Sequence, residues 1–369
     1  MRNSTRVCGQ AGIVFVLPSM KISGGVQEAL GLAADLSQLG VPTEVVSLWV
    51  SPHPVPAPIM PVTLLSQWVT HARRVPLQLP AIALRFARWL RHRFPPNEQS
   101  RAQVIFTHYS TLPLALLVVP QQRWVFVQDL EWKFMASPLL GGLLRAATLA
   151  LYRRCRLIAA NDYLKAELQR LGLTVEAEAP IWAGRAFVAA EIASRDIDLV
   201  MVLRKGAHKR LDLYVDLLRR LKATDVVPSV AVITTEDEIA AQSLSVHHWL
   251  RPDVPTMRSV YARARCFVHL SEHEGFGLPP LEAMAAGCVP YCRDSGGIRA
   301  YMVGDLNALV VPRSRSVEEI AQDLLTLLGD SKRLEHLSGV ARAVFQSGLD
   351  RAATRRAHLS ECLSTAAAR

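Results

Sequence analysis

The sequence lacks several features that would place it in a familiar class of protein. No uninterrupted apolar run among its 369 residues approaches the roughly 20 residues that a membrane-spanning helix needs. The 6 cysteines are scattered, and no pair has the Cys-x-x-Cys spacing typical of a zinc site. The apolar stretch after the polar residues 1–10 is short and lacks the small-residue cleavage site of a signal peptide. We therefore expect reduced thiols and a cytoplasmic location.

The composition is that of a folded protein with more than one domain. Half of the residues are hydrophobic and 20% are charged, which excludes an intrinsically disordered chain. The length is sufficient for two domains of ordinary size. The formal net charge is +10, and a basic surface favours nucleic acid, anionic lipid or phosphorylated small molecules as partners. Charge alone does not distinguish among these partners.

Short apolar runs alternate with segments of helical periodicity along both halves of the chain. This pattern predicts an α/β fold in which helices cover both faces of parallel sheets. The expected strands are residues 13–17, 45–50, 104–106, 124–127, 157–160, 199–203, 230–234, 266–270, 289–291 and 308–311. The expected helices include residues 26–39, 163–171, 211–221, 281–286 and 317–328.

An irregular stretch over residues 175–194 predicts the boundary between two domains. It contains Pro180 and Gly184 and has few of the residues typical of strands. We expect an N-terminal domain over residues 1–184 and a C-terminal domain over residues 185–345. Residues 346–369 are expected to form a C-terminal helix, a candidate to pack back on the first domain.

A basic amphipathic helix is predicted over residues 77–94. Ile82, Phe86 and Leu90 fall on one side of the helical wheel, whereas Arg85 and Arg88 fall on the other. The same pattern fits a surface helix that packs on its own domain and a helix that docks on a membrane. Both interpretations remain open at this point.

The segment 271–304 has the features of an anion-binding site. Gly275 and Gly277 allow a sharp turn and a close approach to a ligand after a buried strand. Pro279 and Pro280 suit the first turn of a helix, which we expect to begin near Leu281. The amides and the positive dipole end of that helix would face the turn, where a diphosphate could bind.

Two carboxylates bracket this turn. Glu274 precedes it, and Glu282 is expected in the first turn of the helix. A carboxylate beside a phosphate does not bind the phosphate itself, so sugar hydroxyls are the obvious hydrogen-bond donors to it. A second glycine-containing loop, with Asp294, Gly296 and Gly297, follows the next strand and should lie at the same edge of the sheet.

The segment Glu274-Gly-Phe-Gly-Leu-Pro-Pro-Leu-Glu282 resembles the Glu-x7-Glu signature of family 4 retaining glycosyltransferases. That resemblance implies a GT-B fold, with two Rossmann-like domains and a cleft between them. It also implies that Glu274 contacts the donor sugar and that Glu282 binds the ribose of the nucleotide. The sugar and the diphosphate would be held by amides of the turn, formed by Gly275, Phe276, Gly277 and Leu278.

A pair of cations after the strand 199–203 agrees with this resemblance. Arg204 and Lys209 have the spacing of the Arg and Lys that bind the donor diphosphate in the family. Positive charge there would stabilise the pyrophosphate as it leaves. The alternative is a solvated basic turn, since Lys205 and Arg210 lie beside them. The family usually has Gly directly before the Arg, where this chain has Leu203.

The N-terminal half carries further residues that resemble the family. Gly24 and Gly25, expected in a turn after the first strand, resemble its first glycine loop, which faces the phosphates and the acceptor. His108 follows the strand 104–106 and is a candidate acceptor residue. The segment that begins at Gln128 and Asp129 and ends at Glu131 resembles some bacterial rhamnosyltransferases. Asp129 could orient an acceptor hydroxyl.

These observations predict a retaining glycosyltransferase that uses a nucleotide-sugar donor. The acceptor would be a glycan or a lipid-linked glycan in the assembly of bacterial surface polysaccharide, with a rhamnosyl- or mannosyltransferase-like activity. We expect neither a metal nor a cofactor, because Arg204 and Lys209 would stabilise the charge. The basic helix would permit peripheral association with an anionic inner membrane surface.

Two other classes of function fit the sequence less well than a glycosyltransferase does. A dehydrogenase would need Gly-x-Gly-x-x-Gly after its first strand, and Gly24-Gly25 lacks that spacing. A non-catalytic scaffold or polyanion-binding protein would fit the charge of +10. However, no basic stripe interleaved with aromatic residues marks a nucleic-acid surface, so nucleic acid is not expected as a partner.

Overall fold

The computed structural model divides the chain into two compact units, which we describe separately. The first unit contains Met1–Ile181 together with Ala352–Arg369, and the second contains Trp182–Arg351. The residues described are 12–20, 23–51, 62–66, 75–94, 102–135, 137–180, 185–188, 194–240 and 247–368. The Pro-rich loop expected near residues 52–61 and the expected boundary residue Gly184 lie outside them.

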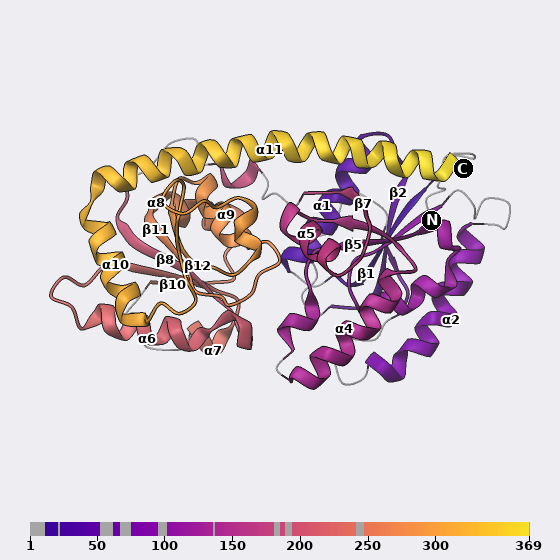
Figure 1. Ribbon diagram of the computed structural model, residues 1–369, viewed down its shortest axis with the longest axis horizontal. Helices are drawn as coiled ribbons and strands as arrows, with labels where there is room; N and C mark the ends of the chain where they lie inside the picture. Colours follow the sequence, from indigo (N-terminus) through magenta and orange to yellow (C-terminus); the bar gives the residue numbers. More distant parts are fainter. Residues whose placement is uncertain are drawn as a thin grey trace. The chain divides into compact units, whose positions relative to one another are not determined.

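The first unit is built on a seven-stranded sheet in which every neighbouring pair is parallel (Figure 1). The strand order is β3-β2-β1-β4-β5-β6-β7. The bounds are β1 (Ile13–Ser19), β2 (Thr43–Trp49), β3 (Val62–Leu64), β4 (Gln103–Phe106), β5 (Arg123–Val127), β6 (Arg156–Ala159) and β7 (Val175–Glu178). Phe15, Phe106 and Phe126 are fully buried on the central strands, as expected for strands covered on both faces.

Among the described residues of this unit, α-helices cover the sheet together with short 3-10 helices. They are α1 (Gly24–Gln38), α2 (Val75–Arg93), α4 (Pro138–Tyr152) and α5 (Asp162–Arg170). The 3-10 helix η1 (Leu112–Leu117) follows β4. Ser23 caps α1, since its side chain accepts a hydrogen bond from the Val26 amide at 3.3 Å. Asn161 caps α5 in the same way, through the Leu164 amide at 2.8 Å.

The second unit has a six-stranded parallel sheet of order β10-β9-β8-β11-β12-β13. Its strands are β8 (Ile197–Leu203), β9 (Val230–Thr234), β10 (His247–Leu250), β11 (Ala264–His269), β12 (Val289–Arg293) and β13 (Leu309–Val311). Its helices include α6 (Leu211–Lys222), α7 (Asp237–Ala240), α8 (Val254–Arg263), α9 (Leu278–Ala285) and α10 (Val317–Gly329). Leu217 and Leu221 of α6 share one core with Leu324 and Leu327 of α10.

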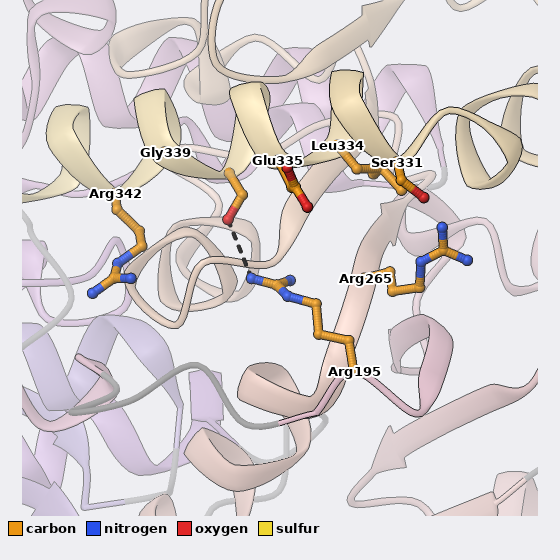
Figure 2. A pocket seen from close by; sticks show the side chains of 8 residues that line it. Arg195, Arg265, Ser331, Leu334, Glu335, Gly339 and Arg342 are labelled. Carbon is orange, nitrogen blue, oxygen red and sulfur yellow. Dashed lines mark hydrogen bonds between the residues drawn. The ribbon is translucent and has the colours of Figure 1, made fainter.

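The last helix, α11 (Ser331–Ala368), contributes residues to both units. In the second unit, Arg195 donates hydrogen bonds to the Gly287 carbonyl at 2.6 Å and to the Ser338 hydroxyl of α11 at 3.1 Å. Arg195, Arg265 and Arg342 lie around a hollow of about 520 Å³ beside α11 (Figure 2). In the first unit, Arg356 of α11 pairs with Asp35 of α1 and donates to the Pro180 carbonyl at 3.2 Å.

The expected helix at residues 77–94 exists as α2, and its apolar side is used within the first unit. Ile82 and Phe86 are fully buried, and the ring of Phe86 lies edge-on to that of Phe106 on β4. The membrane interpretation of this apolar side was therefore wrong, because the side chains that would insert into lipid already form core. The arginines Arg88 and Arg91 on its other side are exposed.

Other expectations need correction. Gly24 and Gly25 are the first two residues of α1 rather than a turn. Residues 175–178, expected in the irregular boundary segment, form the edge strand β7. Further elements were missed, namely β3, β10, α4, α7 and α8. The four residues of β10 are polar or half-exposed, so they lack the apolar run by which a buried strand is recognised.

Candidate active site

The strand order of the second sheet places the predicted donor residues at one point. The chain direction across the sheet reverses at β8, whose neighbours are β9 and β11. Open α/β sheets bind ligands outside the carboxyl ends of the strands at such a switch point. Arg204 follows β8, and Glu274 lies in the loop after β11. The two loops are joined, since the Glu272 amide donates to the His208 carbonyl at 2.7 Å.

Lys209 and Glu274 form an ion pair at this point. The Lys209 Nζ lies 2.8 Å from Oε1 and 3.0 Å from Oε2 of Glu274. Burial by itself would raise the pKa of Glu274, but the Lys209 ammonium and the neighbouring His269 hold that pKa well below its usual value. Glu274 is therefore a buried, permanently ionised acceptor at neutral pH.

His269 is the last residue of β11, and its Nε2 lies 3.4 Å from Oε1 of Glu274. That is an ion-pair distance, but Nε2 makes no well-aligned hydrogen bond to any described residue. The turn behind it is fixed by the Leu270 amide, which donates to the hydroxyl of the buried Tyr214 at 2.7 Å. Sequence analysis did not select His269, although its place at a strand end directly before the glycine turn was a usable signal.

The two glycine loops are held against each other by backbone hydrogen bonds. The Glu274 amide donates to the Ser295 carbonyl at 3.0 Å, and the Gly297 amide donates to the Glu274 carbonyl at 3.0 Å. A Cβ atom on Gly297 would lie 2.3 Å from the carbonyl carbon of Gly275, so only glycine fits there. Asp294 shapes the second loop by accepting from the Gly296 amide at 3.2 Å.

The helix α9 begins directly after the first glycine turn. Gly277 has a φ of 83°, in the left-handed region, and the helix starts at Leu278 rather than near Leu281 as expected. Pro279 therefore lies in the first turn, whereas Glu282 lies in the second turn and not in the first. Among the described residues, the Gly277 and Leu278 amides have no backbone acceptor. These amides are thus available to an anion at the positive end of the helix dipole, and the diphosphate site that the sequence indicates there stays a prediction.

Glu282 and Arg204 form the other part of the site. Burial raises the pKa of Glu282 to about 7, and the positive charge of Arg204 opposes that rise. The Tyr261 hydroxyl lies 3.4 Å from Oε2 of Glu282 and is its hydrogen-bond partner. The Arg204 guanidinium donates to the hydroxyl of Thr235, at the end of β9. Sequence analysis missed Tyr261 and Thr235, since neither belongs to a recognisable motif.

The first unit brings two of its predicted residues into contact. A Cβ atom on Gly25 would lie 2.9 Å from the Gln128 side-chain oxygen, so α1 approaches the end of β5 closely. That oxygen is buried and accepts no hydrogen bond from any described residue. The structure thus places the start of α1 beside the end of β5, on the carboxyl edge of the first sheet.

His108 and Glu131 lie near Tyr109 on this edge. Burial lowers the pKa of His108 to about 4, so its imidazole is neutral at physiological pH. Its Nδ1 lies 2.8 Å from the Ser110 hydroxyl. Burial raises the pKa of Glu131 to about 7, against backbone hydrogen bonds that include one from Tyr109. Asp129 Oδ1 accepts a hydrogen bond from the following amide at 2.8 Å, which shapes the loop.

The described part of the chain lacks two features that would change the interpretation of the site. None of its helices is long and apolar enough to cross a membrane. No group of three or more His, Cys, Asp or Glu residues in it could hold a metal ion.

Two compact units, each built on a doubly wound parallel sheet, define the GT-B class of fold. Solved structures share it across nearly the whole chain. Sucrose-phosphate synthase from Thermosynechococcus elongatus matches with a TM-score of 0.80 at 14% identity, over 97% of this chain and all of its own. HepE of Anabaena, solved with UDP and glucose, matches with a TM-score of 0.73 at 14% identity, over 96% and 100%. The expected fold is confirmed.

Residues 185–344 match the family Glycosyl transferases group 1. A putative glycosyltransferase 41 of Sulfolobus islandicus filamentous virus is 38% identical over 79 residues, 20% of this chain and 24% of its own. A GDP-mannose:cellobiosyl-diphosphopolyprenol alpha-mannosyltransferase of Komagataeibacter xylinus is 31% identical over 140 residues, 33% of this chain and 35% of its own. The chain thus spans about a quarter to a third of the length of these two relatives.

Proposed function

We propose that this protein is a retaining glycosyltransferase of the family 4 type. It transfers a sugar from a nucleoside diphosphate sugar to an acceptor hydroxyl. The observation that carries the proposal is the Lys209–Glu274 ion pair. The pair lies beside two glycine loops that are joined by backbone hydrogen bonds, at the switch point of a domain that matches a glycosyltransferase family.

The residues of the second unit suggest how the donor binds. The Gly277 and Leu278 amides and the α9 dipole would receive the diphosphate. Lys209 has three N–H donors, so it can contact a phosphate oxygen while it holds Glu274. Glu274, fixed and ionised, would accept hydrogen bonds from the sugar hydroxyls. Arg204 adds positive charge from the neighbouring loop.

The chemical step follows from this placement. The bond between the anomeric carbon and the diphosphate oxygen breaks, and its electron pair leaves with the diphosphate. The acceptor oxygen attacks from the same face, and its proton passes to the departing phosphate oxygen. Arg204, Lys209 and the helix amides stabilise the growing negative charge, which is the role that a metal ion has in other transferases. Positioning of the acceptor supplies much of the remaining rate enhancement.

Glu282 would bind the ribose of the donor. Ribose hydroxyls donate to a carboxylate, and such hydrogen bonds favour its charged form. Because burial holds the pKa of Glu282 near 7 in the free protein, donor binding would release a proton from it at slightly acidic pH. The affinity for the nucleotide should therefore fall as the pH drops below 7.

The acceptor would lie at the carboxyl edge of the first sheet. Gly24, Gly25 and His108 line that edge, together with Gln128, Asp129 and Glu131. The relative from Komagataeibacter xylinus is named for transfer of mannose to a cellobiosyl-diphosphopolyprenol. That similarity supports a glycan or lipid-linked glycan acceptor, a mannosyl- or rhamnosyltransferase-like activity, and a role in bacterial surface polysaccharide at the inner membrane face.

A panel of nucleotide sugars, including GDP-mannose and UDP-glucose, tests the proposal. A true donor should raise the melting temperature by mass action and should release nucleoside diphosphate on slow hydrolysis or transfer. Glu274→Gln should reduce turnover at least 100-fold. Glu272→Gln is the matched control, because Glu272 lies two residues away with its side chain 43% exposed. Equal effects of the two variants would refute the assigned role of Glu274. Binding of heparin or oligonucleotides without donor turnover would instead support a non-catalytic, polyanion-binding protein.

A further inference from the structure

Large apolar side chains are exposed together on one face of the first unit. On α4, Leu139 and Leu143 are 74% and 61% exposed, and Leu140 lies beside them at 53%. The 3-10 helix η1 contacts both α2 and α4. We define the leucine face as the exposed large apolar side chains of these three elements and of the second residue after η1, which are Leu84, Leu116, Leu117, Val119, Leu139, Leu140 and Leu143.

The sheet topology puts these elements on the same side. The connections from β3 to β4, from β4 to β5 and from β5 to β6 all progress in the same direction across the sheet. Right-handed crossovers therefore place α2, η1 and α4 on one face of it. In Figure 1, α2 and α4 lie on the same side of the first sheet.

The solvent-facing side of α4 is not explained by folding of the unit. Its inner side is formed by Gly141, Thr148, Leu149 and Tyr152, which are buried. Its outer side presents leucine and alanine, and Arg145 is the one charged residue of the helix. Isolated exposed leucines are ordinary, but an apolar surface that continues over neighbouring elements marks an interaction site.

The segment of the sequence that carries this surface is rich in basic residues, which favours an anionic partner. Residues 45–161 contain 13 Lys and Arg but only 3 Asp and Glu, a balance of +10. Arg93, Lys133 and Arg156 of this segment pair with carboxylates outside it, which are Glu44, Glu167 and Glu176. No acidic residue occurs between Trp132 and Asn161. Arg88, Arg91 and Arg145 are exposed and form no ion pair with any described residue.

We propose that the leucine face docks on an anionic lipid bilayer. The leucines of α4 enter the interfacial region, while the exposed arginines of α2 and α4 contact the lipid headgroups. A second copy of this surface would bring like charges together, and a nucleic acid would leave the leucines unused. The inference deepens the proposed function, since an enzyme with a lipid-linked acceptor needs such a surface, but its test does not depend on turnover.

Sedimentation with vesicles tests the proposal on the full-length protein. We expect the wild type to bind vesicles of phosphatidylcholine mixed with phosphatidylglycerol, and to bind pure phosphatidylcholine at least tenfold more weakly. Leu139→Glu/Leu143→Glu should reduce binding to the mixed vesicles at least tenfold. Arg88→Glu/Arg91→Glu should reduce it and weaken its dependence on salt. Val226→Glu is the matched control, because Val226 is 77% exposed in the second unit.

Thermal melting and a donor-hydrolysis assay accompany each variant. Unchanged melting shows that the exposed leucines were replaced without unfolding, and unchanged hydrolysis separates docking from the chemistry of the donor site. The proposal is overturned if the wild type does not bind the anionic vesicles at low salt. It is also overturned if the leucine variant binds as the wild type does. A dimer that the leucine variant dissociates, without vesicle binding by the wild type, would assign the surface to self-association instead.

Discussion

The Lys209–Glu274 ion pair allows a quantitative test of the candidate active site. The Lys209 Nζ lies 2.8 Å from the Glu274 Oε1, and the side chain of Glu274 is 12% exposed. At an effective dielectric constant of about 20, unit charges at that separation attract by roughly 6 kcal/mol. Desolvation offsets most of this attraction in the intact pair, but removal of one partner leaves a buried charge uncompensated and should cost about 3–5 kcal/mol. Lys209→Met should cost more than Glu274→Gln, because it leaves the buried carboxylate without its cation.

Urea denaturation of the wild type, both single variants and the double variant measures this effect. We expect a coupling energy of at least about 1 kcal/mol near neutral pH. The pKa of Glu274 is depressed, so its stabilisation is fully present above the unfolded-state value of 4.5 and is lost as the pH falls through the folded-state value. The difference between wild type and Lys209→Met should therefore shrink in acid.

The same variants separate binding from catalysis. Glu274→Gln frees the Lys209 ammonium for phosphate, so calorimetry should show unchanged or tighter binding of the nucleoside diphosphate while turnover falls. Lys209→Met should weaken that binding. A coupling energy below about 0.5 kcal/mol, or equal loss of nucleotide affinity in both variants, would refute the reasoning.

Three further predictions concern other parts of the structure. Because burial raises the pKa of Glu282 to about 7, the free protein should lose stability as the pH rises from 4.5 to 7, and melting curves of Glu282→Gln should lack this component. Gly297→Ala should lower the free energy of unfolding by more than about 2 kcal/mol and abolish donor binding, since its Cβ would meet backbone at 2.3 Å. Gly339→Ala in α11 is the control. A Cβ atom there would meet no other atom within 4 Å, so this variant should stabilise the protein slightly in the same denaturation assay. Arg356→Ala should destabilise the first unit by about 1–3 kcal/mol, because it removes the ion pair with Asp35. Limited proteolysis should then cleave the last turns of α11 faster than in the wild type, and an unchanged cleavage rate would show that the pair does not hold them.

The sequence by itself determined the type of fold and the segment that carries the donor site. Buried parallel strands are short apolar runs that can be recognised one at a time, so β1, β9 and β11 were located close to their observed bounds. The glycine turn with Glu274 and Glu282 is local in sequence, and its meaning depends on backbone freedom and helix geometry. The same local reasoning missed β10 and α4, because neither has the apolar pattern of an ordinary buried strand or surface helix.

Only the tertiary structure decided which side chains meet. Lys209 and Glu274 are 65 residues apart, and they form a pair because strand order places β8 beside β11. The same packing selected His269 and Tyr261 as neighbours of the two carboxylates. It also buried the apolar side of α2 and left the leucines of α4 exposed. Hydrophobic periodicity shows that a helix has an apolar side, but which partner covers that side depends on contacts between residues distant in the chain.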